Sequence, residues 1–271
     1  MNTSIVCEFM QQVAYNAGKA IMQVFENQLI WQTEFKPDNS PVTAADKIAN
    51  EIICQELIQK YSQIPIISEE NTEVDYQVRK HFNYYFLIDP LDGTKEFLNR
   101  NADFSVNIAL ICQNEVVAGV VFLPVLNKMY FASQSNGAFL IEENKPAQKL
   151  QVSNFSFDQT GIKVARSRSQ HNEATKKAIE MLNQPQEFII GASLKFLKIA
   201  EGDLDFYPRF SSQMNEWDVA ANQIIVEEAG GQIIDLKTKQ KMSYNKPDLK
   251  VNSFLVFGQA ENVNLIAQFY E

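Results

Sequence analysis

The segment Phe86-Leu87-Ile88-Asp89-Pro90-Leu91-Asp92-Gly93-Thr94-Lys95-Glu96-Phe97 decides how the rest of the chain is interpreted. The apolar run 84–88 is typical of a strand buried on both faces, and it ends at the carboxylate of Asp89. Because proline has no N–H to donate, we expect the strand ladder to stop at Pro90. The segment therefore predicts a central strand that delivers a carboxylate to the edge of a sheet.

The residues after this strand indicate a turn into a helix. Gly93 supplies backbone freedom, and Asp92 or Thr94 can cap free N–H groups. Two carboxylates, a hydroxyl and a helix N-terminus would then meet at one strand end, which suits Mg²⁺ and a phosphate. An isolated Asp-Pro-x-Asp-Gly is also ordinary turn chemistry, so the hypothesis depends on acids elsewhere in the chain.

Composition limits the class of protein. The chain has 271 residues, of which 45% are hydrophobic and 21% charged, and this fits one large domain or two packed halves. A net charge of −9 argues against a nucleic-acid or anionic membrane surface. We find no signal-like start or membrane-length apolar run, so we expect no integral membrane segment. The expected location is the cytoplasm, and a loose association with the inner membrane is an alternative.

Cysteine and histidine chemistry is not indicated. Cys7, Cys54 and Cys112 form no C-x-x-C pair, which argues against a disulfide framework or a thiolate zinc site. His81 and His171 are the only histidines and lack the spacing of zinc hydrolases.

The first third of the chain predicts two helices and a short strand. Apolar residues at spacings of three and four, from Ile5 to Val24, predict an amphipathic helix ending near Asn27. Thr43 and Asp46 resemble a capping box that opens a second helix, and this is an alternative to any catalytic role for either residue. The segment 65–68 reads as a buried strand that ends at Glu69-Glu70. If this strand pairs with the strand 84–88, Glu69 lies at the same edge of the sheet as Asp89 and Asp92.

The remaining segments predict two mixed halves. Strands at 104–112, 116–123, 128–133, 138–141 and 149–153 indicate a run of antiparallel hairpins. Further strands are expected at 162–165, 188–190, 204–207, 232–236 and 253–257, with helices at 172–182, 194–201, 219–229 and 261–269. We predict an α/β (α+β) fold with halves 1–155 and 156–271 that share one layered core.

Five acids lie at element boundaries: Asp46, Glu69, Asp89, Asp92 and Asp218. Asp218 falls in the first turn of the helix after Trp217, where an acid is favourable even without a ligand. If the five cluster, their ionised forms are strongly disfavoured unless cations are present. Two or three Mg²⁺ ions would meet this need and would also activate water.

In order and spacing, four motifs resemble those of the Mg²⁺-dependent, Li⁺-sensitive phosphatase superfamily of inositol monophosphatase and fructose-1,6-bisphosphatase. They are Lys36…Ser40-Pro41-Val42-Thr43-Ala44-Ala45-Asp46, Ser68-Glu69-Glu70, Asp89-Pro90-Leu91-Asp92-Gly93-Thr94 and Trp217-Asp218-Val219-Ala220-Ala221. The likeness covers nearly the whole chain and implies a layered αβαβα sandwich of the sugar-phosphatase type.

Further segments are most similar to the CysQ-type 3'(2'),5'-bisphosphate nucleotidases within that superfamily. They are Asp92-Gly93-Thr94-Lys95-Glu96-Phe97, Phe104-Ser105-Val106-Asn107-Ile108-Ala109-Leu110, Ser167-Arg168-Ser169, Ser193-Leu194-Lys195-Phe196 and Tyr207-Pro208-Arg209-Phe210. Ser68, where inositol phosphatases carry glycine, favours the same branch.

The resemblance implies a role for each matching residue. Glu69, Asp89 and the carbonyl of Leu91 would hold one Mg²⁺, and Asp89, Asp92 and Asp218 a second, with a looser third ion near Glu69. Thr94, hydrogen-bonded to Asp46, would help Glu69 to orient and deprotonate the attacking water. Substrate would contact the stretch 91–94, including the N–H groups of Gly93 and Thr94, together with Glu69 and Asp218.

The second phosphate and the base have their own candidates. Arg168, Lys195 and Arg209 are candidates to clamp a phosphate, and Tyr207 or Phe210 to pack on adenine, but for each residue the simpler explanation as a surface cation or a core aromatic is the stronger one.

The resemblance implies a Mg²⁺-dependent phosphatase that converts adenosine 3',5'-bisphosphate to AMP and phosphate. Members of the family often accept the sulfated analogue too. The alternatives are an inositol or sugar monophosphatase on the same scaffold and a catalytically silent nucleotide- or metal-binding module. We expect a small nucleotide bisphosphate as the ligand, no nucleic acid, and a monomer or homodimer.

Overall fold

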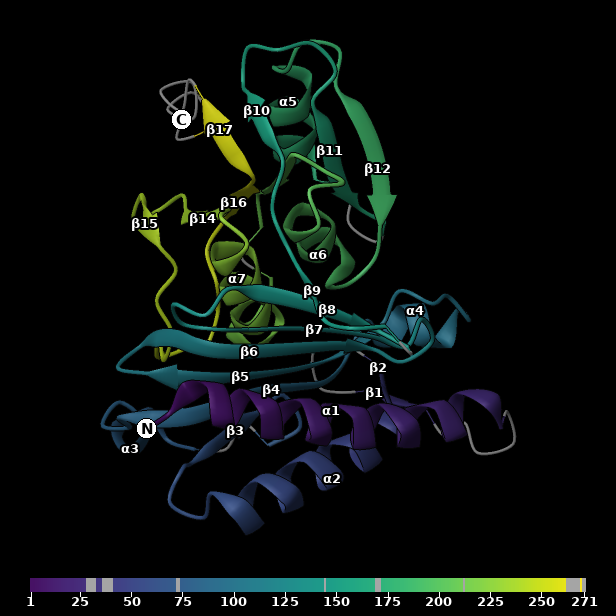
Figure 1. Ribbon diagram of the computed structural model, residues 1–271, viewed down its shortest axis with the longest axis vertical. Helices are drawn as coiled ribbons and strands as arrows, with labels where there is room; N and C mark the ends of the chain where they lie inside the picture. Colours follow the sequence, from purple (N-terminus) through teal and green to yellow (C-terminus); the bar gives the residue numbers. More distant parts are fainter. Residues whose placement is uncertain are drawn as a thin grey trace.

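Helices and sheets alternate in five layers. The computed structural model describes residues 1–27, 33–35, 41–71, 74–143, 145–168, 172–211, 213–261 and 269. In Figure 1, helices α1 and α2 cover one face of a seven-stranded sheet, α6 and α7 lie between that sheet and a six-stranded one, and α5 covers the far side. The predicted αβαβα order is confirmed.

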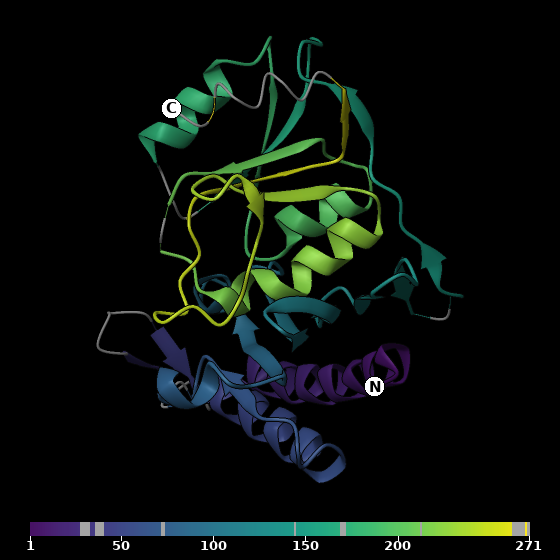
Figure 2. The same ribbon diagram turned by 90° about the vertical axis from the view of Figure 1, so that its left-hand side faces the viewer.

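The outer helices begin as their sequence patterns predict. Helix α1 (Thr3–Glu26) is capped by Asn2 and ends at Asn27, and α2 (Ala44–Lys60) opens with the capping box of Thr43 and Asp46. The buried face of α1 differs from the predicted one in its first turn. Ile5, which was expected to be buried, is exposed, and Val6 is buried in its place. Figure 2 shows both helices stacked below the seven-stranded sheet.

The first sheet follows the order β3-β4-β5-β6-β7-β8-β9. Strand β3 runs parallel to β4, while the other neighbours are antiparallel, as predicted for a mixed and largely antiparallel sheet. The strands are β3 (Ile66–Ser68), β4 (Tyr84–Asp92), β5 (Ser105–Cys112), β6 (Glu115–Leu123), β7 (Lys128–Ser133), β8 (Ala138–Glu142) and β9 (Gln148–Lys149).

The strand predicted at 149–153 is wrong beyond Lys149. The N–H of Val152 donates instead to the carbonyl of Ala229 at 3.1 Å, so the chain leaves the first sheet there and joins the middle layer. The short pair β1 (Thr33–Phe35) and β2 (Pro41–Thr43) precedes β3 in the chain, and the single-turn helix α3 (Tyr76–Arg79) lies between β3 and β4. The residues 36–40 lie outside the described part of the chain.

The second sheet follows the order β12-β11-β13-β16-β14-β15. Its elements are β11 (Lys163–Ser167), α5 (Glu173–Glu180), β12 (Gln186–Ile190), β13 (Phe206–Arg209), β14 (Gln232–Asp235), β15 (Gln240–Lys241) and β16 (Phe254–Phe257). Sequence patterns missed the parallel pair β10 (Asn154–Ser156) and β17 (Gln259–Glu261). Glu261 ends β17, so the helix predicted at 261–269 does not begin there, and 262–268 lie outside the described residues.

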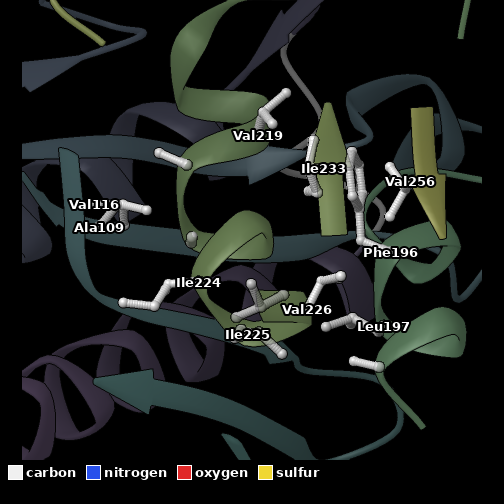
Figure 3. Packing of buried hydrophobic residues seen from close by; sticks show 14 of the residues in the cluster. Ala109, Val116, Phe196, Leu197, Val219, Ile224, Ile225, Val226, Ile233 and Val256 are labelled. Carbon is white, nitrogen blue, oxygen red and sulfur yellow. The ribbon is translucent and has the colours of Figure 1, made fainter. Parts of the chain in front are cut away.

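The middle layer carries the largest apolar core. Helices α6 (Leu194–Ala200) and α7 (Glu216–Glu228) are packed between the two sheets. Figure 3 shows Ile224, Ile225 and Val226 of α7 among side chains from both sides. One cluster extends from Ile67 of the first sheet to Val256 of the second, so α7 is fixed against both. The proposed boundary at residue 155 stays a prediction.

Among the described residues, the structure has no helix that is both long and apolar enough to cross a membrane.

Candidate active site

Parallel pairing of β3 with β4 brings two acids to one edge of the first sheet. Ser68 is in register with Ile88, and the N–H of Glu69 donates to the carbonyl of Ile88 at 3.0 Å. Glu69 and Asp89 therefore leave neighbouring strands side by side, because parallel strands end at the same edge. The sequence analysis made the position of Glu69 depend on pairing between the segments 65–68 and 84–88, and this pairing is present.

The end of β4 differs from the prediction at Pro90. Pairing with β5 resumes at Asp92, opposite Ser105, after an irregularity that begins at Asp89. A local bulge removes the need for a donor at proline, so the strand continues through it. The N–H of Leu91 donates to Asp89 Oδ1 at 3.1 Å, which fixes the first carboxylate.

The turn after β4 depends on glycine. Gly93 has φ of 91°, and a Cβ there would lie 2.9 Å from the carbonyl oxygen of Asp103. Gly93 itself is the N-cap of α4 (Thr94–Leu98), which has no side-chain cap, so the predicted capping by Asp92 or Thr94 is wrong.

The hydroxyl of Thr94 points to Asp46 instead. Thr94 Oγ1 donates to Asp46 Oδ1 at 3.1 Å, which is the contact that the family resemblance implied. Asp46 Oδ2 accepts from the Thr43 N–H at 2.7 Å and from its hydroxyl at 2.6 Å. Asp46 thus both opens α2 and supports Thr94, so the two interpretations are compatible. Burial is the main cause that raises the pKa of Asp46 to about 6.

Helix α7 brings a third acid from the other half of the chain. Asp218 occupies the capping-box position and accepts from the Asn215 N–H at 2.8 Å. Glu69, Asp89 and Asp218 each offer a carboxylate oxygen, and these three atoms lie within 4.8 Å of one another. Asp92 is not in that set of three, but it lines the same cleft.

The electrostatics of these acids favour a cation. Burial, followed by the charges of Glu69, Asp92 and Asp218, raises the pKa of Asp89 well above its ordinary value. Burial and the charges of Asp92 and Glu69 raise the pKa of Asp218 to about 8. Oxygen-only donors, close together and poorly compensated by protein cations, are the ligand chemistry of Mg²⁺ and similar ions. The residues present therefore fit a divalent metal.

The acids open into a cleft of about 270 Å³ between the two halves. It is lined by Glu69, Asp89, Leu91, Asp92, Gly93, Thr94, Lys95, Glu96, Ser167, Ala192, Lys195, Phe196, Tyr207, Arg209, Gln213, Met214, Asn215, Asp218 and Lys250. The lining thus combines the acids with four cations, Lys95, Lys195, Arg209 and Lys250. A cleft with both metal-binding acids and cations suits a ligand that carries more than one anionic group.

Two of the predicted phosphate-binding cations lie in this cleft. Lys195 is buried, its Nζ donates to the carbonyl of Ala192 at 2.6 Å, and burial lowers its pKa to about 8. Arg209 is 6% exposed, and within the described part of the chain its Nε has no hydrogen-bond partner. The hydroxyl of Tyr207, another buried residue of the cleft, makes no hydrogen bond of ordinary geometry there, although the neighbouring Arg209 side chain opposes the rise that burial causes in its pKa. Buried polar atoms of this kind point to a ligand.

Arg168 and Phe210 are placed differently. Arg168 is not among the residues that line the cleft, and its guanidinium contacts Glu96 at 3.1 Å and Asp103 at 2.8 Å. Its charge is therefore already compensated by two carboxylates, and its role as a phosphate clamp stays a prediction. Phe210 lines a smaller adjoining pocket together with Tyr207.

Sequence reasoning gave no role to a buried polar cluster behind Asp92. The hydroxyl of Ser193 donates to Asp92 Oδ2 at 2.6 Å and accepts from the side-chain amides of Asn107 and Asn222. This hydrogen bond and the charge of Lys195 oppose the rise that burial causes in the pKa of Asp92. These residues are spread over four elements, so no local spacing could have indicated them.

The fold and the site together define a layered α/β protein with an acid-lined cleft suited to divalent cations. The chain belongs to the inositol monophosphatase family, whose family model matches residues 2–270. Members of this family are metal-dependent.

Curated relatives and solved structures agree with this assignment. The chain is 40% identical over 248 residues to the 3'(2'),5'-bisphosphate nucleotidase CysQ of Escherichia coli O6:H1, a match that covers 90% of this chain and 98% of that protein. It is 42% identical over 228 residues to CysQ of Salmonella typhimurium, covering 84% and 89%. The crystal structure of CysQ from Bacteroides thetaiotaomicron superposes with a TM-score of 0.79 at 31% identity, covering 94% of this chain and 98% of that one.

Proposed function

We propose that this protein is a Mg²⁺-dependent 3'(2'),5'-bisphosphate nucleotidase that removes the 3'-phosphate of adenosine 3',5'-bisphosphate, leaving AMP and phosphate. The sulfated analogue is a second proposed substrate. The observation that carries the proposal is the cleft itself, in which Glu69, Asp89 and Asp218 converge and which the buried cations Lys195 and Arg209 also line. Its similarity to the CysQ nucleotidases over most of their length supports the same substrate class.

The acids divide into two proposed metal-binding sets. Glu69, Asp89 and the carbonyl of Leu91 would form one, and Asp89, Asp92 and Asp218 the other, with Asp89 shared between them. A third, looser ion would lie near Glu69. When bound, Mg²⁺ supplies the positive charge that phosphoryl transfer requires and acidifies the attacking water.

The chain's own residues position the water and the phosphate. Thr94, whose hydroxyl is held by Asp46, would act with Glu69 to orient the water and accept its proton. The N–H groups of Gly93 and Thr94, at the start of α4, would donate to the phosphate that is removed. No side chain needs to become covalently attached, because alignment and charge neutralisation account for most of the catalysis of phosphoryl transfer.

The cations of the cleft would recognise the second phosphate. Arg209 Nε is buried and lacks a partner in the described residues, the Tyr207 hydroxyl lies beside the Arg209 side chain, and the Lys195 ammonium lies over the Tyr207 ring. A phosphate would accept from Arg209 Nε. These residues distinguish a nucleoside bisphosphate from a substrate with one phosphate.

Phosphate release from three substrates tests the proposal. Adenosine 3',5'-bisphosphate, inositol 1-phosphate and fructose 1,6-bisphosphate are compared in Mg²⁺ and then in EDTA, and the nucleotide should be preferred, with activity only in Mg²⁺. A preference for inositol 1-phosphate would instead identify an inositol monophosphatase. An enzyme that is equally active in EDTA would overturn the metal assignment.

A single variant tests the role of Arg209 in binding the second phosphate. Arg209→Met should raise KM for adenosine 3',5'-bisphosphate about 10- to 100-fold, since a charge-assisted hydrogen bond contributes about 1.5–3 kcal/mol. It should leave KM for adenosine 3'-monophosphate nearly unchanged. Arg166→Met is a matched control, because Arg166 pairs with Glu187 and does not line the cleft. Equal losses for both nucleotides would contradict the assignment of Arg209 to the second phosphate.

A further inference from the structure

The hydroxyl of Ser193 is surrounded by partners from three other elements. Ser193 is 0% exposed and immediately precedes α6. Its Oγ lies 2.6 Å from Asp92 Oδ2 on β4, 3.0 Å from Asn107 Nδ2 on β5 and 2.8 Å from Asn222 Nδ2 on α7. Asp92 and Asn107 belong to the first half of the chain, whereas Ser193 and Asn222 belong to the second.

Other contacts of the two asparagines set the direction of these hydrogen bonds. The Asn107 amide donates through Nδ2 to Ser193 and also donates to the Asp92 carboxylate, which has no proton to give when ionised, while its Oδ1 lies 2.8 Å from the Ser105 hydroxyl. Asn222 Nδ2 also donates to the carbonyl of Asp218 at 2.9 Å, which a reversed amide could not do.

One acceptor therefore receives the single proton of Ser193. The Ser193 oxygen accepts from both amides, and its proton goes to Asp92 Oδ2 at 2.6 Å, because Asn107 Oδ1 is farther away at 3.3 Å and already occupied by Ser105. The cluster thus favours one orientation of the Asp92 carboxylate. Through Asn222 it is also joined to the backbone of Asp218.

We propose that Ser193, held by Asn107 and Asn222, is a positioning residue that orients Asp92 relative to Asp218 for metal binding. The inference rests on the proposed function, in which both acids hold Mg²⁺. Through Ser193 and Asn222, the cluster links the end of β4 to the start of α7, which carry these two acids. Its role is to keep acids from different halves at a fixed separation.

The effect should appear in metal affinity. Removing a side chain that orients a metal ligand typically lowers metal affinity 10- to 100-fold. Ser193→Ala deletes the hydroxyl donor to Asp92, which keeps the Asn107 amide and the Ser193 backbone N–H, and it removes one acceptor from each of the two amides. We expect the dissociation constant for Mg²⁺ to rise at least tenfold, with a matching rise in the Mg²⁺ concentration needed for half-maximal activity.

Titration of the metal-free protein with MgCl₂, followed by calorimetry, measures this effect directly. Ser153→Ala is the matched control, since Ser153 Oγ donates to the buried carboxylate of Asp205 at 2.7 Å and neither residue lines the cleft. Both variants should lose similar thermal stability, and only Ser193→Ala should lose Mg²⁺ affinity. Equal Mg²⁺ affinity in Ser193→Ala and wild type would overturn the inference.

Two further results keep the test decisive. If Ser193→Ala does not fold, Ser193→Cys has nearly the same shape with a weaker donor, and it should still bind Mg²⁺ more weakly than wild type. Unchanged affinity in that variant would again overturn the inference. Wild-type protein that neither binds Mg²⁺ nor releases phosphate would overturn the proposed function itself, which separates the two failures.

Discussion

Replacing Gly119 by alanine should move Asp218 away from the other acids. Gly119 lies on β6 where α7 packs, and an added Cβ would lie 2.6 Å from Ile224 Cγ2, 2.7 Å from the Ala221 carbonyl oxygen and 2.9 Å from Ala221 Cα. Ordinary contacts between such atoms are about 3.5–4.0 Å, so the separation must grow by about 1 Å. Two of the three contacted atoms are helix backbone, which cannot rotate away.

The displacement has a cost in both stability and activity. Overpacking of this kind destabilises by about 1–3 kcal/mol. Asp218 lies one turn before Ala221 on the same helix, so it moves with the helix by a similar distance. A misplacement of about 1 Å can lower a catalytic rate about a hundredfold. We therefore expect a large loss of kcat and weaker Mg²⁺ binding.

Gly18→Ala is the matched control for this prediction. Its added Cβ would meet the ring of Phe122, which belongs to the same strand β6, but it acts through α1, an element that contributes no residue to the cleft. Urea unfolding gives the stability of each variant, and phosphate release over a range of Mg²⁺ concentrations gives kcat and half-saturation. We expect both alanine variants to be destabilised to a similar extent, and only Gly119→Ala to lose kcat. If Gly119→Ala is destabilised but keeps wild-type kcat and Mg²⁺ dependence, the reasoning about α7 is wrong.

Three shorter predictions concern the acids and Thr94. Asp89→Asn keeps an acceptor for the Leu91 N–H, so the Tm of this variant in EDTA should match that of wild type. Mg²⁺ should no longer raise its Tm, and turnover should be abolished. Substantial remaining activity would show that Asp89 does not hold the metal. The pKa of Asp218, about 8 in the folded state against about 3.9 when unfolded, means that the metal-free fold holds a proton that the unfolded chain releases. Stability of the metal-free protein should therefore fall as pH rises from about 4 to about 8, while calorimetric Mg²⁺ affinity should rise between pH 6 and pH 8; an affinity independent of pH would contradict this. Thr94→Val should lower kcat at least a hundredfold with little change in Tm, whereas Thr94→Ser should retain most activity, and a fully active valine variant would exclude the hydroxyl from catalysis.

Much of the fold could be predicted from local patterns. The capping box of Thr43 and Asp46, the antiparallel hairpins from 105 to 142 and the helix that carries Asp218 each depend on residues close together in the chain. Two strand ends were predicted wrongly, because local sequence rules did not account for a bulge or for a change of layer. Pro90 did not end its strand, because a bulge accommodates a residue without an N–H, and the chain after Lys149 turned to another layer.

Local patterns and a family resemblance were enough to name the acids, the elements that end in them and the chemistry they serve. Long-range packing set three other features: carboxylate oxygens of Glu69, Asp89 and Asp218 lie within 4.8 Å of one another, Arg168 pairs with Glu96 and Asp103, and Ser193 contacts Asp92. None of these could be predicted locally, because helix and strand signals act over a few residues. The distances within the site are set by the packing of α7 between two sheets, which joins residues more than a hundred positions apart.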